Sequence, residues 1–191
     1  MKNKQNIAYI ETEKLIIRPW RNESRDLIDL YTYASVPGVG ESAGWNHHMS
    51  LEHSQAILDG FCRNDENYAI ELKSSKRVIG SISLRRTNYS PKILVFYSRG
   101  REIGYVLSKY YWNNGYMTEA VKGMLGFAFD VLNLDFVSGR CRKNNYASRR
   151  VLEKSGFSFE QNILINSVDG ELSDGFLMLY TKSEWLANQL S

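Results

Sequence analysis

Apolar positions along the chain recur at three- and four-residue steps in two segments, and this spacing is typical of one helix face. The first segment follows Gly115, and its predicted buried stripe consists of Met117, Ala120, Val121, Met124, Leu125, Ala128, Val131 and Leu132. The second lies between Asn145, a good N-cap residue, and Gly156, a residue type that commonly ends helices. Its inward positions are Ser148, Val151, Leu152 and Ser155. Both segments are therefore predicted to be amphipathic helices packed on a core.

Shorter apolar runs predict strands around these helices. The run 103–107 leads into the first helix, and the run 134–141 leads into the second. Further strands are expected at 15–20, 68–72, 77–84, 157–166 and 175–181, and further helices at 23–33, from Ser50 to residue 63 or 64, and at 184–190. Within 77–84, we expect Val78, Gly80, Ile82 and Leu84 to share one face of the sheet. Residues 88–100 fit either an added strand or a local excursion.

The order of the elements indicates one domain. A strand and two helices come first, followed by a hairpin, a strand-helix-strand-helix unit and two final strands. No linker, internal repeat or low-complexity segment interrupts this order. We therefore expect one mixed α/β sheet in a single domain that spans residues 1–191.

Composition narrows the class of protein. Of 191 residues, 43% are hydrophobic and 24% are charged, which is ordinary for a folded domain. The net charge of +3 is too small, and the basic residues are too scattered, to favour nucleic acid as a partner. No apolar run approaches the ~18 to 20 residues of a membrane span, so we expect a cytoplasmic protein without a membrane partner. Cys62 and Cys141 have neither zinc nor disulfide spacing, and we expect both to be reduced.

The segment 102–120 carries the most informative chemistry, because it joins a strand, a tight turn and a helix N-terminus. The first turn of a helix has backbone NH groups without partners and a partial positive charge, and both favour a phosphate or pyrophosphate. Gly115 would let the backbone approach such a ligand closely. A glycine at this kind of turn also occurs for steric reasons alone, so a second motif is needed.

Two motifs together resemble the acetyl-CoA site of the GNAT superfamily of N-acetyltransferases. They are E-I-G-Y-V-L with Y-W-N-N-G-Y-M-T-E-A, at 102–107 and 111–120, and N-Y-A-S-R-R-V-L-E-K-S-G-F at 145–157. The segment 11–20 resembles the opening strand of the RimJ/RimL-like branch, which acetylates ribosomal-protein N-termini. The likeness covers nearly the whole chain. It implies a single-domain α/β fold with a mixed, mostly antiparallel sheet flanked by helices, in which the strands that begin near 102 and 134 splay apart to hold the cofactor.

The resemblance also implies which residues hold acetyl-CoA. Backbone groups of residues 105–107 would pair with the pantetheine arm, and one NH would polarise the thioester carbonyl. Amides of residues 113–118 would hold the pyrophosphate. The expected cofactor-binding residues are Tyr105, Val106, Leu107, Trp112, Asn113, Asn114, Gly115, Tyr116, Met117, Thr118 and Asn145. For Asn145, helix capping is an equal alternative, and the two roles can coexist.

The chain departs from the superfamily pattern Arg/Gln-x-x-Gly-x-Gly/Ala at two positions. Trp112 stands first, as is usual in the RimJ/RimL-like branch. Met117 stands last in place of a small residue, and we expect it to narrow the cradle.

Acetyl transfer to an amine also needs groups that move protons. In much of the superfamily a tyrosine on the 145–157 helix protonates the leaving thiolate, but Leu152 occupies that position here. Ser148 is therefore the candidate donor, with a packing serine as the alternative. Glu102 is the candidate general base, directly or through water, and a solvated glutamate at a strand end is the alternative. Tyr105 and Tyr116 are weaker candidates for proton transfer.

The segment 35–48 is the expected acceptor-side lip, because it joins two helices, contains three glycines and shows no helical or strand periodicity. Its candidate substrate-binding residues are Glu41, Trp45, His47 and His48. A mobile surface connection is the alternative. An adjacent histidine pair cannot easily chelate one ion, so no metal site is expected.

These features predict an acetyl-CoA-dependent N-acetyltransferase in which a bound amine attacks the thioester directly. The acceptor is either a protein N-terminus or a small amine. A covalent route through Cys141 is ranked far lower, because no histidine neighbours it in sequence. The alternative from another class is a non-catalytic acyl-CoA-binding or regulatory module, which Met117 and Leu152 keep open. Exposed strands near the C-terminus could also pair in a homodimer.

Overall fold

The computed structural model describes residues 9–87, 99–166 and 169–189, which form an eight-stranded sheet with the order β1-β2-β3-β4-β5-β6-β8-β7. The strands are β1 (Ile10–Glu11), β2 (Leu15–Pro19), β3 (Asn67–Leu72), β4 (Arg77–Arg86), β5 (Gly100–Leu107), β6 (Phe136–Arg142), β7 (Ser158–Asn166) and β8 (Leu172–Thr181). The pair β5–β6 is parallel, and the other paired strands are antiparallel. The fold is therefore the predicted mixed, mostly antiparallel α/β sheet.

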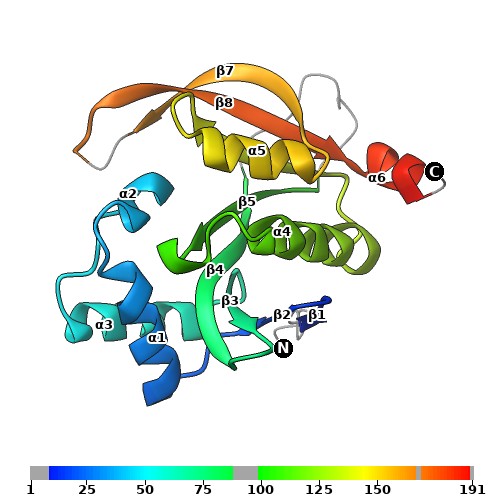
Figure 1. Cartoon of the computed structure of the whole chain (residues 1–191). Helices are drawn as coiled ribbons and strands as arrows, with labels where there is room; N and C mark the ends of the chain where they lie inside the picture. Colours follow the sequence, from blue (N-terminus) through cyan, green and yellow to red (C-terminus); the bar gives the residue numbers. More distant parts are fainter. Residues whose placement is uncertain (1–8, 88–98, 167–168, 190–191) are drawn as a thin grey trace.

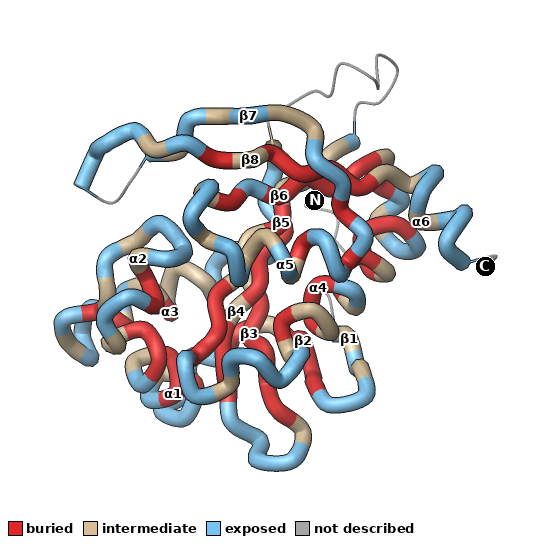
Figure 2. The backbone as a smooth tube through the Cα atoms, turned by 45° about the horizontal axis from the view of Figure 1, so that its top comes forward, coloured by how far each residue is buried: buried red, intermediate tan, exposed pale blue. Residues whose placement is uncertain are grey.

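Helices cover both faces of the sheet (Figure 1). They are α1 (Ser24–Ala34), α2 (Val39–Ala43), α3 (Leu51–Arg63), α4 (Tyr116–Gly126), α5 (Tyr146–Lys154) and α6 (Lys182–Gln189), with a 3-10 turn η1 (Lys109–Tyr111) and a π-helical turn η2 (Phe127–Val131). Helices α1, α2 and α3 pack with one face of β3 to β5 in a smaller core, which includes Trp20, Tyr33 and Leu58. Helices α4 and α5 pack on the opposite face in the main core. Figure 2 shows buried backbone through the central strands between these layers.

The parallel pair β5–β6 separates along its length. Pairing runs from Gly100 opposite Phe136 to Ile103 opposite Gly139 and then stops. Beyond that point, residues 104–107 pair with β4 alone, while Arg140 to Arg142 pair with β8 alone. Gly139 lets α5 approach, because an added Cβ would lie 2.7 Å from a Leu152 methyl carbon. The expected splayed strand pair is therefore present, with its apex at Ile103 and Gly139.

Most element predictions are confirmed, including the helix stop at Gly156, whose φ is +103°. The single-face prediction for Val78, Gly80, Ile82 and Leu84 is wrong. A bulge leaves Ile79 unpaired between Val78 and Gly80, so Val78 joins the smaller core while Ile82 and Leu84 join the main core. An inserted residue reverses side-chain alternation, and the sequence carries no local sign of it.

The buried stripe of the long helix departs from the prediction at one position, since Leu132 still packs against the main core. Val131 is exposed, because the chain leaves α4 at Phe127 and continues as the π-helical turn η2. The wider turn rotates the last positions relative to the 3.6-residue period. The open question at 88–100 falls mostly outside the described residues, and β5 begins at Gly100.

A buried ion network connects β2, β3 and α1. The Arg18 guanidinium donates two hydrogen bonds of 2.8 Å to the Asp26 carboxylate and one of 2.7 Å to Glu71. All three residues are buried, with 3%, 1% and 8% of their surface exposed. The Arg18 guanidinium thus provides a positively charged hydrogen-bond partner for two buried carboxylates.

Candidate active site

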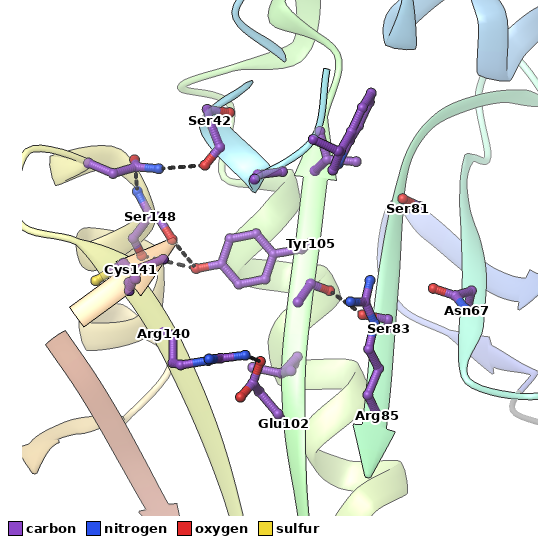
Figure 3. Close-up of a pocket in the computed structure, with 18 of the residues that line it drawn as sticks. Ser42, Asn67, Ser81, Ser83, Arg85, Glu102, Tyr105, Arg140, Cys141 and Ser148 are labelled. Carbon is purple, nitrogen blue, oxygen red and sulfur yellow. Dashed lines mark hydrogen bonds and ion pairs between the residues drawn. The ribbon is translucent and has the colours of Figure 1, made fainter. Parts of the chain in front are cut away.

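A cavity of about 910 Å³ lies where β5 and β6 separate. Its walls come from α2 and α3, the faces of β4 and β5, the end of β6, the start of α5 and the end of β7. Figure 3 shows Tyr105 pointing from β5 toward Ser148, and Glu102 and Arg140 facing each other across the gap between the strands. The cavity therefore joins part of the cofactor-side candidates, Tyr105, Val106 and Asn145, with Trp45 and His48 of the acceptor side, whereas residues 112–118 lie outside its lining.

The N-terminus of α4 follows β5 and the 3-10 turn η1 along the chain. Gly115 precedes the helix with φ +79°, and apart from its two chain neighbours no described residue has a heavy atom within 4 Å of where its Cβ would stand. Asn113 is also left-handed, with φ 62°. The N-cap residue, Gly115, has no side chain, so the amides of the first turn are not used by a capping side chain. An open, uncapped helix N-terminus with this backbone fits a phosphate group.

Two side chains of this turn have structural contacts. The Trp112 indole donates a 2.8 Å hydrogen bond to the Leu107 carbonyl, and Asn114 donates one of 2.9 Å to the Trp112 carbonyl. Met117 is 6% exposed and packs in the main core. The expectation that Met117 narrows the cradle is therefore wrong, because its side chain points away from the helix entrance into the protein interior.

The start of α5 contacts both β5 and α2. Asn145 caps the helix by accepting a 3.0 Å hydrogen bond from the Ser148 amide, and it donates one of 3.1 Å to the Ser42 carbonyl. The Tyr105 hydroxyl lies 3.0 Å from both the Ser148 carbonyl oxygen and Ser148 Oγ. Burial raises the pKa of Tyr105. The two hydroxyls thus form a hydrogen-bonded pair at the cavity wall.

Glu102 lies at the opposite side of the gap in an ion pair. Arg140 donates a 2.8 Å hydrogen bond to Glu102 Oε1, and the Glu102 side chain is 22% exposed. Within the described part of the chain, its other carboxylate oxygen accepts no hydrogen bond, and Glu102 lines the cavity. The carboxylate is therefore oriented by Arg140 and retains one accessible acceptor oxygen.

The acceptor-side segment is more ordered than expected. The prediction that 35–48 contains no helix is wrong. Helix α2 forms between Gly38 and Gly44, whose φ values are +85° and +90°. Glu41 accepts hydrogen bonds from the Gly38 amide at 2.6 Å and from the His47 amide at 3.2 Å, and its Oε1 lies 2.8 Å from His47 Nδ1. The interaction with His47 lowers the pKa of Glu41 to about 2. Glu41 and His47 therefore stabilise the loop around α2.

His48 is the buried member of the histidine pair. Its Nδ1 lies 2.7 Å from Ser54 Oγ, and its ring centroid is 5.2 Å from that of Trp45 and 4.6 Å from that of His53. Burial, with a smaller effect of His53, lowers the pKa of His48 from 6.5 to about 4. His48 is therefore neutral near neutral pH, and its ring forms part of the cavity wall.

The lowered pKa of His48 predicts a pH-dependent stability. The unfolded chain takes up a proton near pH 6.5 and the folded chain only near pH 4, so stability falls as the pH falls through this window. The loss approaches ~1.4 kcal/mol per pH unit inside the window. We expect urea unfolding to show this slope in the unmodified protein and a much weaker slope in His48→Gln. His53→Gln, which leaves His48 buried, serves as the control and should keep most of the slope.

The site also contains residues that sequence reasoning missed. Ser81, Ser83 and Arg85 on β4 and Arg140 and Arg142 on β6 line the cavity. Polar residues at every second position within each strand were a usable signal, since they share one face of the sheet. Among the predicted substrate residues, Trp45 and His48 line the cavity, whereas Glu41 and His47 pair with each other.

A model of the acetyltransferase (GNAT) domain matches residues 14–158. The chain belongs to the GNAT family. YoaA of Bacillus subtilis, an N-acetyltransferase, is 26% identical over 156 residues, which cover 79% of this chain and 83% of that protein. Among solved structures, a GNAT acetyltransferase of Bacillus anthracis superposes with a TM-score of 0.78 at 23% identity, covering 92% of this chain and 99% of that one. Spermidine N-acetyltransferase of Vibrio cholerae, solved with CoA and spermine, gives 0.73 at 17% identity, with 92% and 99% covered.

This GNAT protein is an N-acetyltransferase with the family's single-domain fold. The family uses acetyl-CoA. Within the described residues, no group of three or more His, Cys, Asp or Glu side chains could hold a metal ion. In ranges 9–87, 99–166 and 169–189, no helix is both long and apolar enough to cross a membrane.

Proposed function

We propose that the whole chain, residues 1–191, acts as one acetyl-CoA-dependent N-acetyltransferase domain of the RimJ/RimL-like branch. In this reaction a bound primary amine attacks the thioester directly. The observation that carries the proposal is the separation of β5 and β6 beside a cavity lined by Ser148 and Glu102, together with the uncapped start of α4 that follows β5 along the chain. The branch assignment rests on the motifs at 11–20 and 111–120.

Acetyl-CoA, when bound, supplies an acetyl group activated as a thioester. The amides of residues 113–118 would hold its pyrophosphate, with Gly115 providing room. The backbone of Tyr105, Val106 and Leu107 would hold the pantetheine, since β6 no longer pairs with this part of β5. Trp112 supports this edge by its hydrogen bond to Leu107, and Asn145 supports it by fixing the start of α5.

Glu102 is the proposed base for the amine. An ammonium group must lose a proton before it can act as a nucleophile, and the carboxylate oxygen not held by Arg140 can receive it directly or through water. Arg140 is a positioning residue in this scheme, because its hydrogen bond fixes the orientation of the carboxylate.

Ser148 is the proposed proton donor on the leaving-group side. Its Oγ can give up a proton and receive one from the Tyr105 hydroxyl 3.0 Å away. The raised pKa of Tyr105 keeps that hydroxyl protonated at neutral pH. This pair would take the place of the α5 tyrosine, whose position Leu152 fills with a side chain that is 1% exposed.

Replacing these groups should reduce turnover while leaving cofactor affinity nearly unchanged. We expect a kcat loss of about 100-fold for Glu102→Gln and about tenfold for Ser148→Ala, because each removes a proton-transfer group that is not placed to hold the cofactor. Steady-state kinetics with calorimetric titration of acetyl-CoA checks both. Ser155→Ala is the matched control. Ser155 is a buried serine on the same side of α5, and its Oγ donates a hydrogen bond to the Val151 carbonyl. Unchanged kcat would remove the tested residue from its role.

Amine-dependent release of free thiol from acetyl-CoA tests the function itself. Release with protein N-terminal peptides or small amines would support the enzyme. Tight CoA binding without release across a broad amine panel would instead favour the non-catalytic acyl-CoA-binding module.

Two further expectations belong to this proposal. The protein acts in the cytoplasm, and it forms a homodimer through β7, which ends the sheet and exposes Leu164. Light scattering of the purified protein tests the dimer directly.

A further inference from the structure

The acceptor side of the cavity has a distinctive charge distribution. Among the described residues, its lining includes three arginines, Arg85, Arg140 and Arg142, but a single carboxylate, Glu102. That carboxylate is in an ion pair with Arg140. The remaining polar lining consists of uncharged side chains such as Asn67, Ser81 and Ser83, and of the rings of His48 and His53. His48 is neutral near neutral pH because of its lowered pKa. An amine with several positive charges would meet guanidinium groups rather than free carboxylates in this space.

The arginines share one face of the sheet. Arg85 lies opposite Glu102 in the β4–β5 register, and Arg140 bonds Glu102 from β6. Arg142, two residues after Arg140, projects to the same face of β6, whereas Cys141 between them packs in the main core. The cationic groups therefore lie on the face covered by α1 to α3, away from Leu152 on α5.

Arg142 has unused hydrogen-bonding capacity. Its Nη1 donates a 3.0 Å hydrogen bond to the Glu41 carbonyl of α2. Its Nη2 is buried and has no hydrogen-bond partner in the part of the chain that the structure describes. A buried charged donor without a partner is unfavourable, and a ligand oxygen would relieve that cost. A guanidinium fork matches the two oxygens of a carboxylate better than it matches any neutral group.

We propose that the acceptor is a primary amine that also carries a carboxylate, with Arg142 binding the carboxylate and Arg85 adding positive potential at the cavity rim. This proposal rests on the proposed function and specifies its substrate class. The carboxylate-bearing amine is either a free amino acid or the acidic N-terminal residue of a peptide. Polyamines are excluded as preferred acceptors. Their extra ammonium groups would lose water on binding, and the lining within the described residues has no unpaired carboxylate to compensate for that loss.

The decisive experiment measures thiol release from acetyl-CoA with matched amines. The small-molecule pairs are γ-aminobutyrate with γ-aminobutyramide and β-alanine with β-alaninamide, and spermidine is the polycationic comparison. The peptide pair is Asp-Ala-Ala-amide with Asn-Ala-Ala-amide. We expect kcat/KM to be at least about tenfold higher for the carboxylate member of a pair. A preference among the small amines identifies a free amino acid, and a preference confined to the peptides identifies an N-terminal acidic residue.

Variants test whether Arg142 causes the preference for carboxylate-bearing amines, and a binding measurement tests that preference without turnover. Arg142→Gln should bring the carboxylate-to-carboxamide ratio close to unity, while Arg142→Lys should keep part of it. Arg86→Gln is the control, because Arg86 is an exposed neighbour on β4 that does not line the cavity. Calorimetric titration of γ-aminobutyrate into the unmodified protein, compared with its amide, gives a readout that needs neither turnover nor a variant.

The outcomes separate the two proposals. Turnover with equal or better use of carboxamides or spermidine overturns the carboxylate proposal and leaves the acetyltransferase in place. A carboxylate preference that survives Arg142→Gln unchanged overturns the role of Arg142. Absence of thiol release with every amine overturns the proposed function and the acceptor class with it.

Discussion

Replacing Gly115 with tryptophan is expected to weaken acetyl-CoA binding by about 100-fold or more, equivalent to a loss of about 3 kcal/mol of binding free energy. Apart from the two chain neighbours of Gly115, no described residue has a heavy atom within 4 Å of the position that a Cβ would take, so the indole would enter the open space at the start of α4. If this space is the pyrophosphate site, the side chain and the phosphates compete for it. Calorimetric titration with acetyl-CoA measures the change.

Gly170→Trp is the matched control for this substitution. Gly170 has a φ of +86° and also has no described heavy atom within 4 Å of an added Cβ, but it lies in the turn between β7 and β8. Both variants carry the same left-handed strain of roughly 1 kcal/mol. Binding that survives in Gly170→Trp and is lost in Gly115→Trp would support the cradle. Equal affinity in both variants would place the pyrophosphate elsewhere.

Arg18→Met is expected to reduce the free energy of unfolding by about 3 to 5 kcal/mol. The substitution keeps an apolar side chain of similar length but leaves Asp26 and Glu71 buried without their common guanidinium partner. Two uncompensated carboxylates in the interior then oppose folding. Urea unfolding followed by circular dichroism measures the loss.

Two comparisons show whether the buried charges cause this loss. A triple variant that adds Asp26→Leu and Glu71→Met should recover most of the stability, since replacing all members of a buried network by apolar groups is far less costly than breaking it. Lys14→Met removes an exposed ion pair with Glu13, at 3.8 Å, and should change stability by less than about 1 kcal/mol. If the triple variant is no more stable than Arg18→Met, lost packing rather than unpaired charge explains the effect.

Local patterns predicted the elements well wherever an amphipathic period ran undisturbed. The stripe from Met117 to Ala128 is buried as expected, and Asn145 caps α5. Two errors occurred where one residue altered the period, at Ile79 in the bulge of β4 and at Val131 at the end of the π-helical turn. Such insertions are selected by packing against distant elements, so a period read along the chain does not reveal them.

Sequence motifs supplied candidates for the cofactor half of the site and far fewer for its acceptor half. The roles assigned to Gly115, Ser148 and Glu102 follow from motifs contiguous in sequence, and they remain predictions that the experiments above test. By contrast, the sequence did not predict a role for Arg85, Arg140 and Arg142. Basic residues scattered along a sequence are typical of a solvated surface, and only the strand register places these three near one another. That the Met117 side chain does not narrow the cradle was likewise visible only from its position in the main core.

The family could be predicted from motifs that resemble it. Most strands and helices, and the glycine and capping residues at their ends, could be predicted from local sequence, because these depend on contacts a few residues apart. Three features emerged from the folded chain alone: the residue, Ile103, after which the expected separation of β5 and β6 begins, the contact between Tyr105 and Ser148, and the guanidinium groups that the cavity presents beside one paired carboxylate. These features depend on residues tens of positions apart, whose proximity is set by sheet order and register. Hydrophobic spacing along a chain determines which face of an element is buried, but it leaves open which other element lies against that face.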